Sequence, residues 1–171
     1  MDKGCIHFYY GNGKGKTTAA MGLALRALGH GMPVWVVQFL KDGSSGECSI
    51  LERSGASVLA GKAAPGFVSS MTPVQKNATR RLHDQLLEKV SFLMGPKGLL
   101  VLDEAGDALS RGLLDEKKLR NLLDNRAGTE IVLTGHQFIP WLAEKADYIT
   151  EMQARRHPHQ KGLAARPGIE Y

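Results

Sequence analysis

The stretch GNGKGKTTAA (Gly11–Ala20) decides the fold. It follows CIHFYY (Cys5–Tyr10), a short apolar run that is typical of a buried strand. It leads into KTTAAMGLALRALG (Lys16–Gly29), where alanine, leucine and methionine recur at helical spacing. A glycine-rich turn between a strand and a helix can wrap backbone N–H groups around a phosphate. The sequence therefore predicts a phosphate-binding loop close to its start.

This loop is one residue shorter than the usual pattern G-x-x-x-x-G-K-[ST], because it reads G-x-x-x-G-K-T from Gly11 to Thr17. The glycines allow N–H groups to turn inward around an anion, Lys16 brings a positive charge, and Thr17 brings a hydroxyl ligand for Mg²⁺. A glycine-rich turn without a ligand is the alternative interpretation. We expect nucleotide contacts from Gly11, Asn12, Gly13, Lys14, Gly15, Lys16, Thr17 and Thr18.

A second motif, LLVLDE (Leu99–Glu104), is an apolar strand that ends in two carboxylates. Parallel strands end at one edge of a sheet, so Asp103 and Glu104 are expected beside the loop, where one can hold Mg²⁺ directly or through water. The alternative is an acidic pair that is favoured by a helix N-terminus. Thr134 ends the apolar run EIVL, and it either faces the same site or only caps the strand end.

The remaining elements alternate between strands and helices, which predicts an α/β fold with a mostly parallel sheet of about six strands covered on both faces. Together with the loop, this pattern indicates a P-loop NTPase, a RecA-like three-layer sandwich. The expected strands are Cys5–Tyr10, Pro33–Phe39, Ser57–Gly61, Gly98–Ala105, Glu130–Gly135 and Tyr148–Met152; the expected helices are Lys16–Gly29, Gly46–Gly55, Thr72–Met94, Ala105–Ser110, Asp115–Leu123 and Ile139–Lys145.

Length and composition predict one ordinary globular domain over residues 1–171, with 43% hydrophobic residues. No run of about 18 apolar residues predicts a membrane span. The first strand begins within five residues, so no signal peptide is expected. Cys5 and Cys48 are isolated in sequence, which favours reduced thiols and a cytoplasmic protein.

The net charge of +5 is compatible with a polyanionic ligand or with solvated basic surface. A phosphorylated small molecule explains the basic clusters without nucleic acid, since aromatic and basic residues do not interleave. Besides the loop lysines, the basic side chains gather in the tail, at Arg155, Arg156, Lys161 and Arg166, with His157 and His159 beside them.

Taken together, several stretches resemble the ATP:corrinoid adenosyltransferases, a dimeric P-loop family. The loop and the tail are the most specific parts of this resemblance, which covers nearly the whole chain. The similar stretches are GNGKGKTTAA (Gly11–Ala20), VVQFLK (Val36–Lys41), SGE (Ser45–Glu47), LDEAGDAL (Leu102–Leu109), GLLD (Gly112–Asp115), LTG (Leu133–Gly135), ADYITEM (Ala146–Met152) and HPHQKGLAARPGIEY (His157–Tyr171).

The resemblance implies that ATP lies reversed in the loop, so that cobalt(I) of a reduced corrinoid attacks the 5′ carbon of the ribose and inorganic triphosphate leaves. Lys16, Lys14 and Mg²⁺ at Thr17 and Glu104 would stabilise the leaving group. The family further implies a homodimer and a flavoprotein electron donor. No general base is required, because the cobalt itself is the nucleophile.

Three features depart from the pattern of that family. Its segment G-F-T-W corresponds to GFVS (Gly66–Ser69), where Phe67 is expected to pack under the corrinoid, or else only to anchor the loop, and Ser69 replaces a tryptophan. His136 follows Thr134-Gly135 where arginine is common, and only ten residues precede Gly11, so a lid formed by that segment is not inferred. The competing functions are a P-loop ATPase or kinase with another acceptor, and a RecA-like module that binds nucleic acid.

Overall fold

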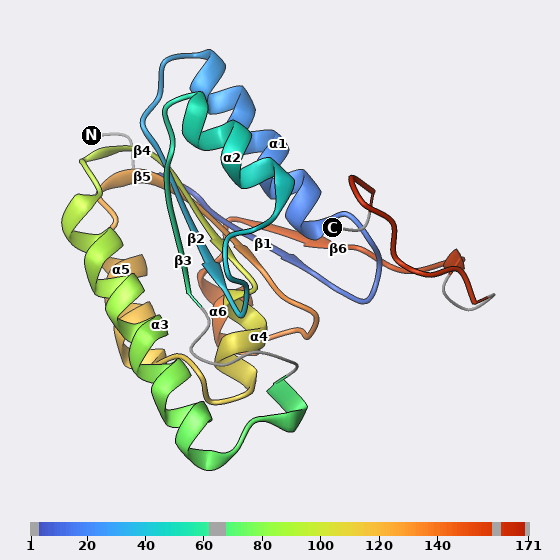
Figure 1. Ribbon diagram of the computed structural model, residues 1–171. Coiled ribbons are helices and arrows are strands. Elements are labelled where there is room, and N and C mark those ends of the chain that lie inside the picture. Colours follow the sequence, from blue (N-terminus) through green and yellow to red (C-terminus); the bar gives the residue numbers. More distant parts are fainter. Residues whose placement is uncertain (1–3, 62–67, 159–161, 170–171) are drawn as a thin grey trace.

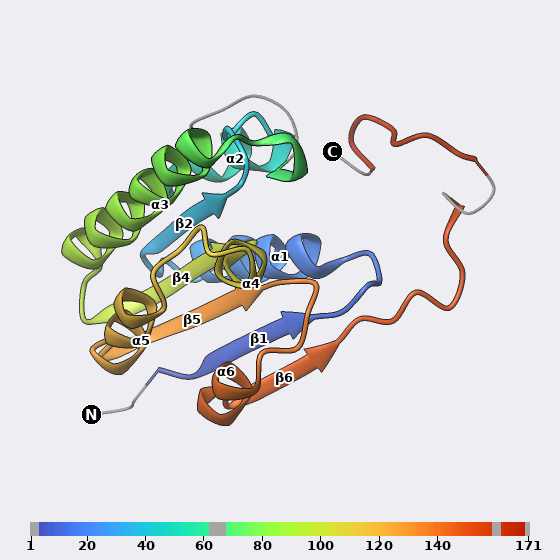
Figure 2. The same cartoon turned by 90° about the horizontal axis from the view of Figure 1, so that it is seen from below.

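The computed structural model describes residues 4–61, 68–158 and 162–169. Six strands form one sheet in the order β3-β2-β4-β5-β1-β6, and every neighbouring pair is parallel. In Figure 2 the labelled strand arrows accordingly point the same way. The strands are β1 (Ile6–Tyr10), β2 (Val34–Phe39), β3 (Ser57–Gly61), β4 (Lys97–Asp103), β5 (Gly128–Thr134) and β6 (Tyr148–Glu151).

Helices cover both faces of this sheet, which makes the three layers that the sequence predicts. Figure 1 shows α1 and α2 on one face, with α3 and α5 on the other. Residues of α4 and α6 pack into the same core as α3 and α5. The helices are α1 (Lys16–Gly29), α2 (Gly46–Arg53), α3 (Pro73–Leu93), α4 (Ala105–Ser110), α5 (Glu116–Asp124) and α6 (Pro140–Lys145), with a short 3-10 helix at Val68–Ser70.

Two hydrophobic cores lie on the two sides of the sheet, and strand β4 contributes to both. Leu100 and Leu102 pack under α3, α4 and α5, whereas Leu99 and Val101 pack under α1 and α2. Alternate side chains of a strand point to opposite faces, so a strand covered on both sides has to be apolar throughout. This requirement explains why β4 reads as a continuous hydrophobic run up to Asp103.

Helix α3 begins where its sequence predicts. The side chain of Thr72 accepts a hydrogen bond from the Gln75 N–H, Gln75 reaches back to the Thr72 N–H, and Pro73 occupies the first turn. This reciprocal capping satisfies two N–H groups that the helix cannot bond internally. The cap fixes where the helix leaves the short 3-10 segment that precedes it.

The expected strands and helices are confirmed, with shifts of one or two residues at some ends; β5, for example, begins at Gly128. The sheet is parallel in all described pairs rather than mostly parallel. Cys5 precedes β1 and is half-buried, whereas Cys48 lies buried in α2. Among the described residues, none of the helices has the length and hydrophobicity that a membrane span requires.

Two glycines let α4 pack directly against the end of β5. A Cβ on Gly135 would lie 2.9 Å from the Gly106 Cα, and a Cβ on Gly106 would lie 3.1 Å from the Gly135 Cα. Both obstacles are backbone atoms, so they cannot rotate aside as a flexible side chain would. This approach sets the position of the carboxylates that open α4 relative to β5.

We predict that Gly135→Ala destabilises the protein by about 1–3 kcal/mol, because the added methyl group pushes backbone against backbone. The matched control is Gly22→Ala, at an exposed position of α1 where a Cβ meets nothing within 4 Å. That control should raise stability by up to about 1 kcal/mol, since alanine favours a helix over glycine. Urea unfolding of both variants measures the difference, and equal stabilities would contradict the packing argument.

Candidate nucleotide and metal site

Three strand ends converge at the carboxyl edge of the sheet. The glycine-rich loop follows β1, Asp103 ends β4, and Thr134 ends β5. In the sheet order, β5 lies between β4 and β1, so these ends are neighbours. Ligands of open parallel sheets bind at this edge, outside the carboxyl ends of the strands. The predicted loop and the predicted carboxylates therefore belong to one site.

The glycines of the loop are required by its backbone and by its neighbours. Gly11 and Gly15 have φ angles of 112° and 115°, which side chains other than glycine rarely adopt. A Cβ on Gly13 would lie 2.6 Å from the carbonyl oxygen of Met152, just after β6. The shortened loop is thus pressed against the end of the neighbouring edge strand.

Two loop amides have partners that the sequence does not predict. The Gly11 N–H donates to the His136 carbonyl at 3.2 Å, and the Gly13 N–H donates to the Met152 carbonyl at 2.6 Å. These amides fix the loop to the sheet instead of turning inward toward an anion. The first bond within α1 runs from the Ala19 N–H to the Gly15 carbonyl, so the N–H groups of residues 16–18 point out of the helix start. These amides, with the positive end of the helix dipole, suit a phosphate.

Lys16 lies over the loop. Its Nζ donates to the carbonyl oxygens of Gly11 at 2.7 Å and Gly13 at 2.8 Å. Burial lowers the pKa of Lys16, although the nearby carboxylates, Asp107 first, oppose that shift. A partly desolvated ammonium at the start of α1 is suited to a polyanion, which would compensate its lost hydration.

Asp103 is the centre of a hydrogen-bond cluster. Its side chain is fully buried. One carboxylate oxygen accepts from the hydroxyls of Thr17 and Thr134, each at 2.8 Å. The other oxygen accepts from Lys41 Nζ at 2.7 Å and Gln38 Nε2 at 3.2 Å. Four donors surround this carboxylate, which explains how a charge survives without solvent contact.

The cluster fixes the orientation of the Thr17 hydroxyl. Because Thr17 gives its only hydroxyl proton to Asp103, the lone pairs of Oγ1 remain for a cation. The four donors around Asp103 favour an indirect role for this carboxylate, behind the metal ligands, over direct coordination. Glu104 is the more accessible carboxylate, with 28% of its side chain exposed. A hydroxyl, a carboxylate and phosphate oxygens are ligands that Mg²⁺ prefers, so these residues fit the ion.

Glu104 has an uncommon backbone conformation, with φ at 59° between β4 and α4. Its N–H donates to the Thr134 hydroxyl at 2.8 Å. Thr134 therefore links the two acidic residues, since the same hydroxyl donates to Asp103. Burial, together with the neighbouring Asp103 and Asp107 carboxylates, raises the pKa of Glu104, while Lys41 acts in the opposite direction. Left-handed residues other than glycine cost free energy and concentrate at functional sites.

Reasoning from the sequence alone missed Lys41, Gln38 and Cys48 as parts of this site. Gln38 pairs in register with Asp103 across β2 and β4, so its amide reaches the carboxylate sideways. The Cys48 thiol donates to Gln38 Oε1 at 3.1 Å and thereby fixes which end of the amide faces Asp103. The sequence feature that could have identified them is the pair of polar residues, Gln38 and Lys41, at the end of an otherwise apolar strand.

His136 lies at the site, where the sequence places it after β5. Asp107 accepts from the His136 N–H at 3.1 Å and pairs with the ring Nδ1 at 3.0 Å. The imidazole is mostly exposed, so Nε2 is directed away from Asp107. The carboxylate therefore fixes the ring beside the phosphate loop.

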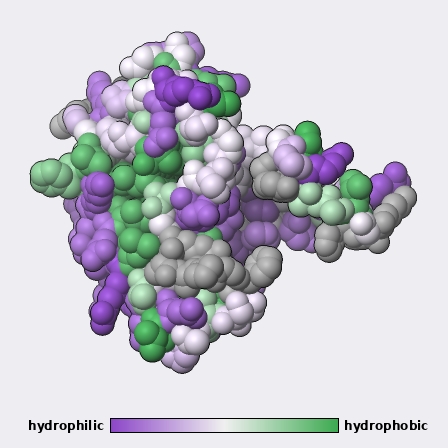
Figure 3. All heavy atoms as spheres, in the orientation of Figure 1, coloured by the Kyte–Doolittle hydropathy of each residue, from purple (hydrophilic) through white to green (hydrophobic). Residues whose placement is uncertain are grey.

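The tail also lies at the loop. Asn12 Oδ1 accepts from the Ala154 N–H at 3.0 Å, and Lys14 Nζ donates to the Ile169 carbonyl. Figure 3 shows the tail projecting from the body of the molecule. Next to the loop is a pocket of about 510 Å³, to which the aromatic rings of Tyr10 and Phe138 contribute. Arg155 lines the same pocket, so part of the basic tail borders the loop.

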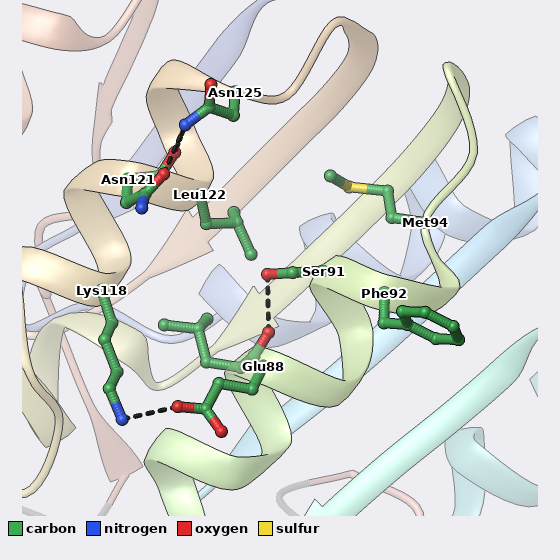
Figure 4. Close-up of a pocket in the computed structure, with 9 residues that line it drawn as sticks. Glu88, Ser91, Phe92, Met94, Lys118, Asn121, Leu122 and Asn125 are labelled. Carbon is green, nitrogen blue, oxygen red and sulfur yellow. Dashed lines mark hydrogen bonds and ion pairs between the residues drawn. The ribbon is translucent and has the colours of Figure 1, made fainter.

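Several expected site residues lie outside the described part of the chain: Phe67, His159 and Lys161. Ser69 is described, in the 3-10 helix that follows Phe67. Another pocket, of about 490 Å³, lies between α3 and α5, where Phe92, Met94 and Asn125 contribute to its lining (Figure 4). It is near the residues that precede β4, at the opposite end of that strand from Asp103, so we do not assign it to the nucleotide site.

A parallel sheet, a glycine-rich loop opening a helix, and a Thr17–Asp103 pair define a P-loop nucleotide-binding protein. The model of the family described as ATP:corrinoid adenosyltransferase BtuR/CobO/CobP matches residues 2–171. The chain therefore belongs to this family, which confirms the resemblance seen in the sequence.

Individual relatives agree with the family match. The chain is 34% identical over 177 residues to the corrinoid adenosyltransferase of Pseudomonas aeruginosa, an alignment that covers 99% of this chain and 85% of that protein. It is 32% identical over 182 residues to corrinoid adenosyltransferase CobA of Salmonella typhimurium and, separately, to the corrinoid adenosyltransferase of Escherichia coli K12. Each of these two alignments covers 99% of this chain and 87% of the relative.

We predict that the thiol of Cys48 is inert in the folded protein. Burial raises its pKa to about 11, so about one thiol in a thousand is a thiolate at pH 8. In a Cys5→Ser variant, an alkylating reagent at pH 8 should leave Cys48 unlabelled in buffer and label it completely in urea. The wild-type protein is the control, because the half-buried Cys5 should react first. Rapid labelling of Cys48 in the folded protein would contradict the prediction that its thiol is buried and protonated.

Proposed function

We propose that this protein transfers the 5′-deoxyadenosyl group of ATP to the cobalt(I) of a corrinoid and releases inorganic triphosphate. The observation that carries this choice of reaction is the family match over residues 2–171. The site geometry supports the ATP half, because a phosphate loop and an oriented Thr17 hydroxyl meet at one edge of the sheet. We further propose that residues 1–171 act as one domain in the cytoplasm.

In this proposal the residues of the loop bind the triphosphate. The outward N–H groups of residues 16–18 and the ammonium groups of Lys16 and Lys14 hold its oxygens, and Gly11–Gly15 give the chain its tight path. Negative charge gathers on the triphosphate as the C5′–O bond breaks. Fixed donors that face this charge lower the barrier without having to reorganise. The nucleophile has no proton to lose, so the reaction needs no general base, and we assign that role to no residue.

Thr17 and Glu104 would hold Mg²⁺, with Asp103 behind them orienting the Thr17 hydroxyl. When bound, the ion supplies positive charge that neutralises the departing triphosphate. The protein's own contribution is to keep Glu104 and Thr17 on one side of the loop. The Thr134 hydroxyl holds them there, because it donates to the Asp103 carboxylate and accepts from the Glu104 N–H.

The corrinoid half of the proposal rests on the family and on sequence. We propose that Phe67 packs against the lower face of the corrinoid and that Ser69 leaves more space there than a tryptophan would. We also propose a homodimer and a flavoprotein as the source of the electron that forms cobalt(I). His136, held by Asp107, is available on the loop side for a phosphate or ribose contact.

The direct test mixes the protein with Mg²⁺, ATP and chemically reduced cobalamin. We expect a light-sensitive cobalt–carbon product and one inorganic triphosphate for each product formed. Lys16→Ala should weaken ATP binding by about 10- to 100-fold, because a charge-assisted contact to phosphate is lost. Lys97→Ala, at the other end of β4, is the matched control and should bind ATP normally. ADP instead of triphosphate, with no photolabile product, would identify an ATPase or kinase and refute the proposal.

Metal-dependent ATP binding should decline at mildly acidic pH. Because burial raises the pKa of Glu104, this side chain takes up a proton at a higher pH than an ordinary glutamate, and the protonated form is a poor ligand for Mg²⁺. The contribution of Mg²⁺ to ATP affinity should therefore be complete near pH 8 and fall as the pH decreases. Calorimetric titration with and without Mg²⁺ measures it.

The control for this pH dependence is Glu104→Gln. Because the protonation of ATP itself is the same in both measurements, it cancels when the variant is compared with the wild-type protein. We expect this variant to bind Mg²⁺–ATP about tenfold more weakly at pH 8. Its metal-dependent affinity should then change less with pH than that of the wild-type protein. Parallel pH profiles for the two proteins would exclude Glu104 as the titrating ligand.

A further inference from the structure

Lys41 is paired with the same two carboxylates that face the metal site. Its Nζ lies 2.7 Å from Asp103 Oδ2 and 3.5 Å from Glu104 Oε1. A quarter of its side chain is exposed, so Lys41 lies at the surface of the site rather than deep in the protein interior. Lys41 therefore neutralises the acidic pair in the described structure.

The backbone conformation just before Lys41 places this residue beside Asp103 and Glu104. Leu40, just after β2, has a φ of 60°, an uncommon left-handed conformation for a branched side chain. The Leu40 N–H donates to Nε2 of His83 at 3.3 Å, and Nδ1 of His83 pairs with the Leu113 carbonyl at 2.8 Å. His83 is fully buried, and burial lowers its pKa, so the neutral ring accepts at one nitrogen and donates from the other. This buried imidazole fixes the turn that carries Lys41 across the end of β4.

A divalent cation on Glu104 and Thr17 would compete with the ammonium for the same negative charge. Two cations within about 4 Å repel each other strongly in a partly buried site. Asp103 can lose Lys41 without becoming unpaired, since Thr17, Thr134 and Gln38 still donate to it. Lysine has a flexible four-carbon stem, so its ammonium can leave the pair while its backbone stays fixed.

We propose that Lys41 is an internal counter-cation that holds the Asp103–Glu104 pair until Mg²⁺–ATP binds, and that its ammonium then moves to the triphosphate. The proposal rests on the proposed function, because Mg²⁺–ATP is the ligand that displaces Lys41. It assigns Lys41 two positions, one on the carboxylates and one on phosphate oxygens. The exchange keeps the acidic pair neutralised in both states.

The test measures metal binding without nucleotide, with Mn²⁺ as the probe and the electron paramagnetic resonance signal of free Mn²⁺ as the readout. Lys41→Met keeps the length of the stem and removes the charge. We expect it to bind Mn²⁺ about tenfold more tightly than the wild-type protein, because the competing cation is gone. The same variant should gain no affinity for Mg²⁺–ATP, because the lost phosphate contact offsets the removed competition.

Lys97→Met is the matched control, because it removes an equal charge from the exposed start of the same strand, β4. It should leave both affinities within about twofold of the wild-type values, since charges this far apart are screened. An unchanged or lower Mn²⁺ affinity in Lys41→Met would overturn the proposal. Equal tightening of Mn²⁺ and Mg²⁺–ATP binding would also overturn it, because the loss of Lys41 would then remove no phosphate contact.

A second measurement uses the wild-type protein, in case Lys41→Met does not fold. Mass spectrometry after brief acetylation reports the reactivity of each lysine, with Lys97 as the internal reference. Mg²⁺ alone should increase the labelling of Lys41 severalfold, and Mg²⁺–ATP should lower it again. Constant labelling of Lys41 in all three states would refute the exchange.

The two proposals fail in different ways. If the wild-type protein does not bind ATP in a Mg²⁺-dependent manner, the proposed function fails without any Lys41 variant. If the wild-type protein binds Mg²⁺–ATP and Lys41→Met binds Mn²⁺ with the wild-type affinity, only the proposed exchange of Lys41 fails. The Lys16→Ala variant separates these cases further, because it removes a loop contact and leaves the Lys41 pair with Asp103 in place.

Discussion

The buried carboxylate of Asp103 is the interaction on which the site depends. Its donors come from the start of α1, from the end of β5, and from β2 with the turn that follows it, so one side chain joins three regions that are distant in sequence. A charge buried this deeply is tolerated only when its hydrogen bonds are satisfied. The positions of Thr17, Thr134, Gln38 and Lys41 at the site therefore depend on a single charged group.

The sheet explains why these donors meet. Parallel strands end at a common edge, and β4 lies between β2 and β5, so its last residue is within reach of polar groups from both neighbours. Gln38 is the direct register partner of Asp103 on β2. Thr134 follows the ladder that joins β4 and β5, where Leu102 pairs with Leu133. Apolar residues fill both faces of the sheet up to this edge, so polar chemistry starts where the strands end.

Local patterns predicted most of this fold and part of the site. The strand–loop–helix order, the two-sided apolar strands and the capped start of α3 are encoded in neighbouring residues, so periodicity and capping rules identify them. Asp103 and Glu104 were predictable for the same reason. Lys41, the Gln38–Cys48 pair and the carbonyl partners of Gly11 and Gly13 are contacts between distant segments. They depend on strand order and register, which a single sequence with six strands leaves open.

The shortened loop has a structural consequence that connects the sheet edge to the ligand. In this loop, which has one residue fewer than the usual pattern, the chain runs close to the ends of β5 and β6, and the amides of Gly11 and Gly13 bond to carbonyls there. These amides are then committed to the protein. Donors that can still face a phosphate include the first turn of α1, Lys14 and Lys16, next to Thr17 and the carboxylates. In the proposed function, such a loop would hold a short part of a polyphosphate close to Thr17 and Glu104, and other contacts would set the direction of the rest of the nucleotide.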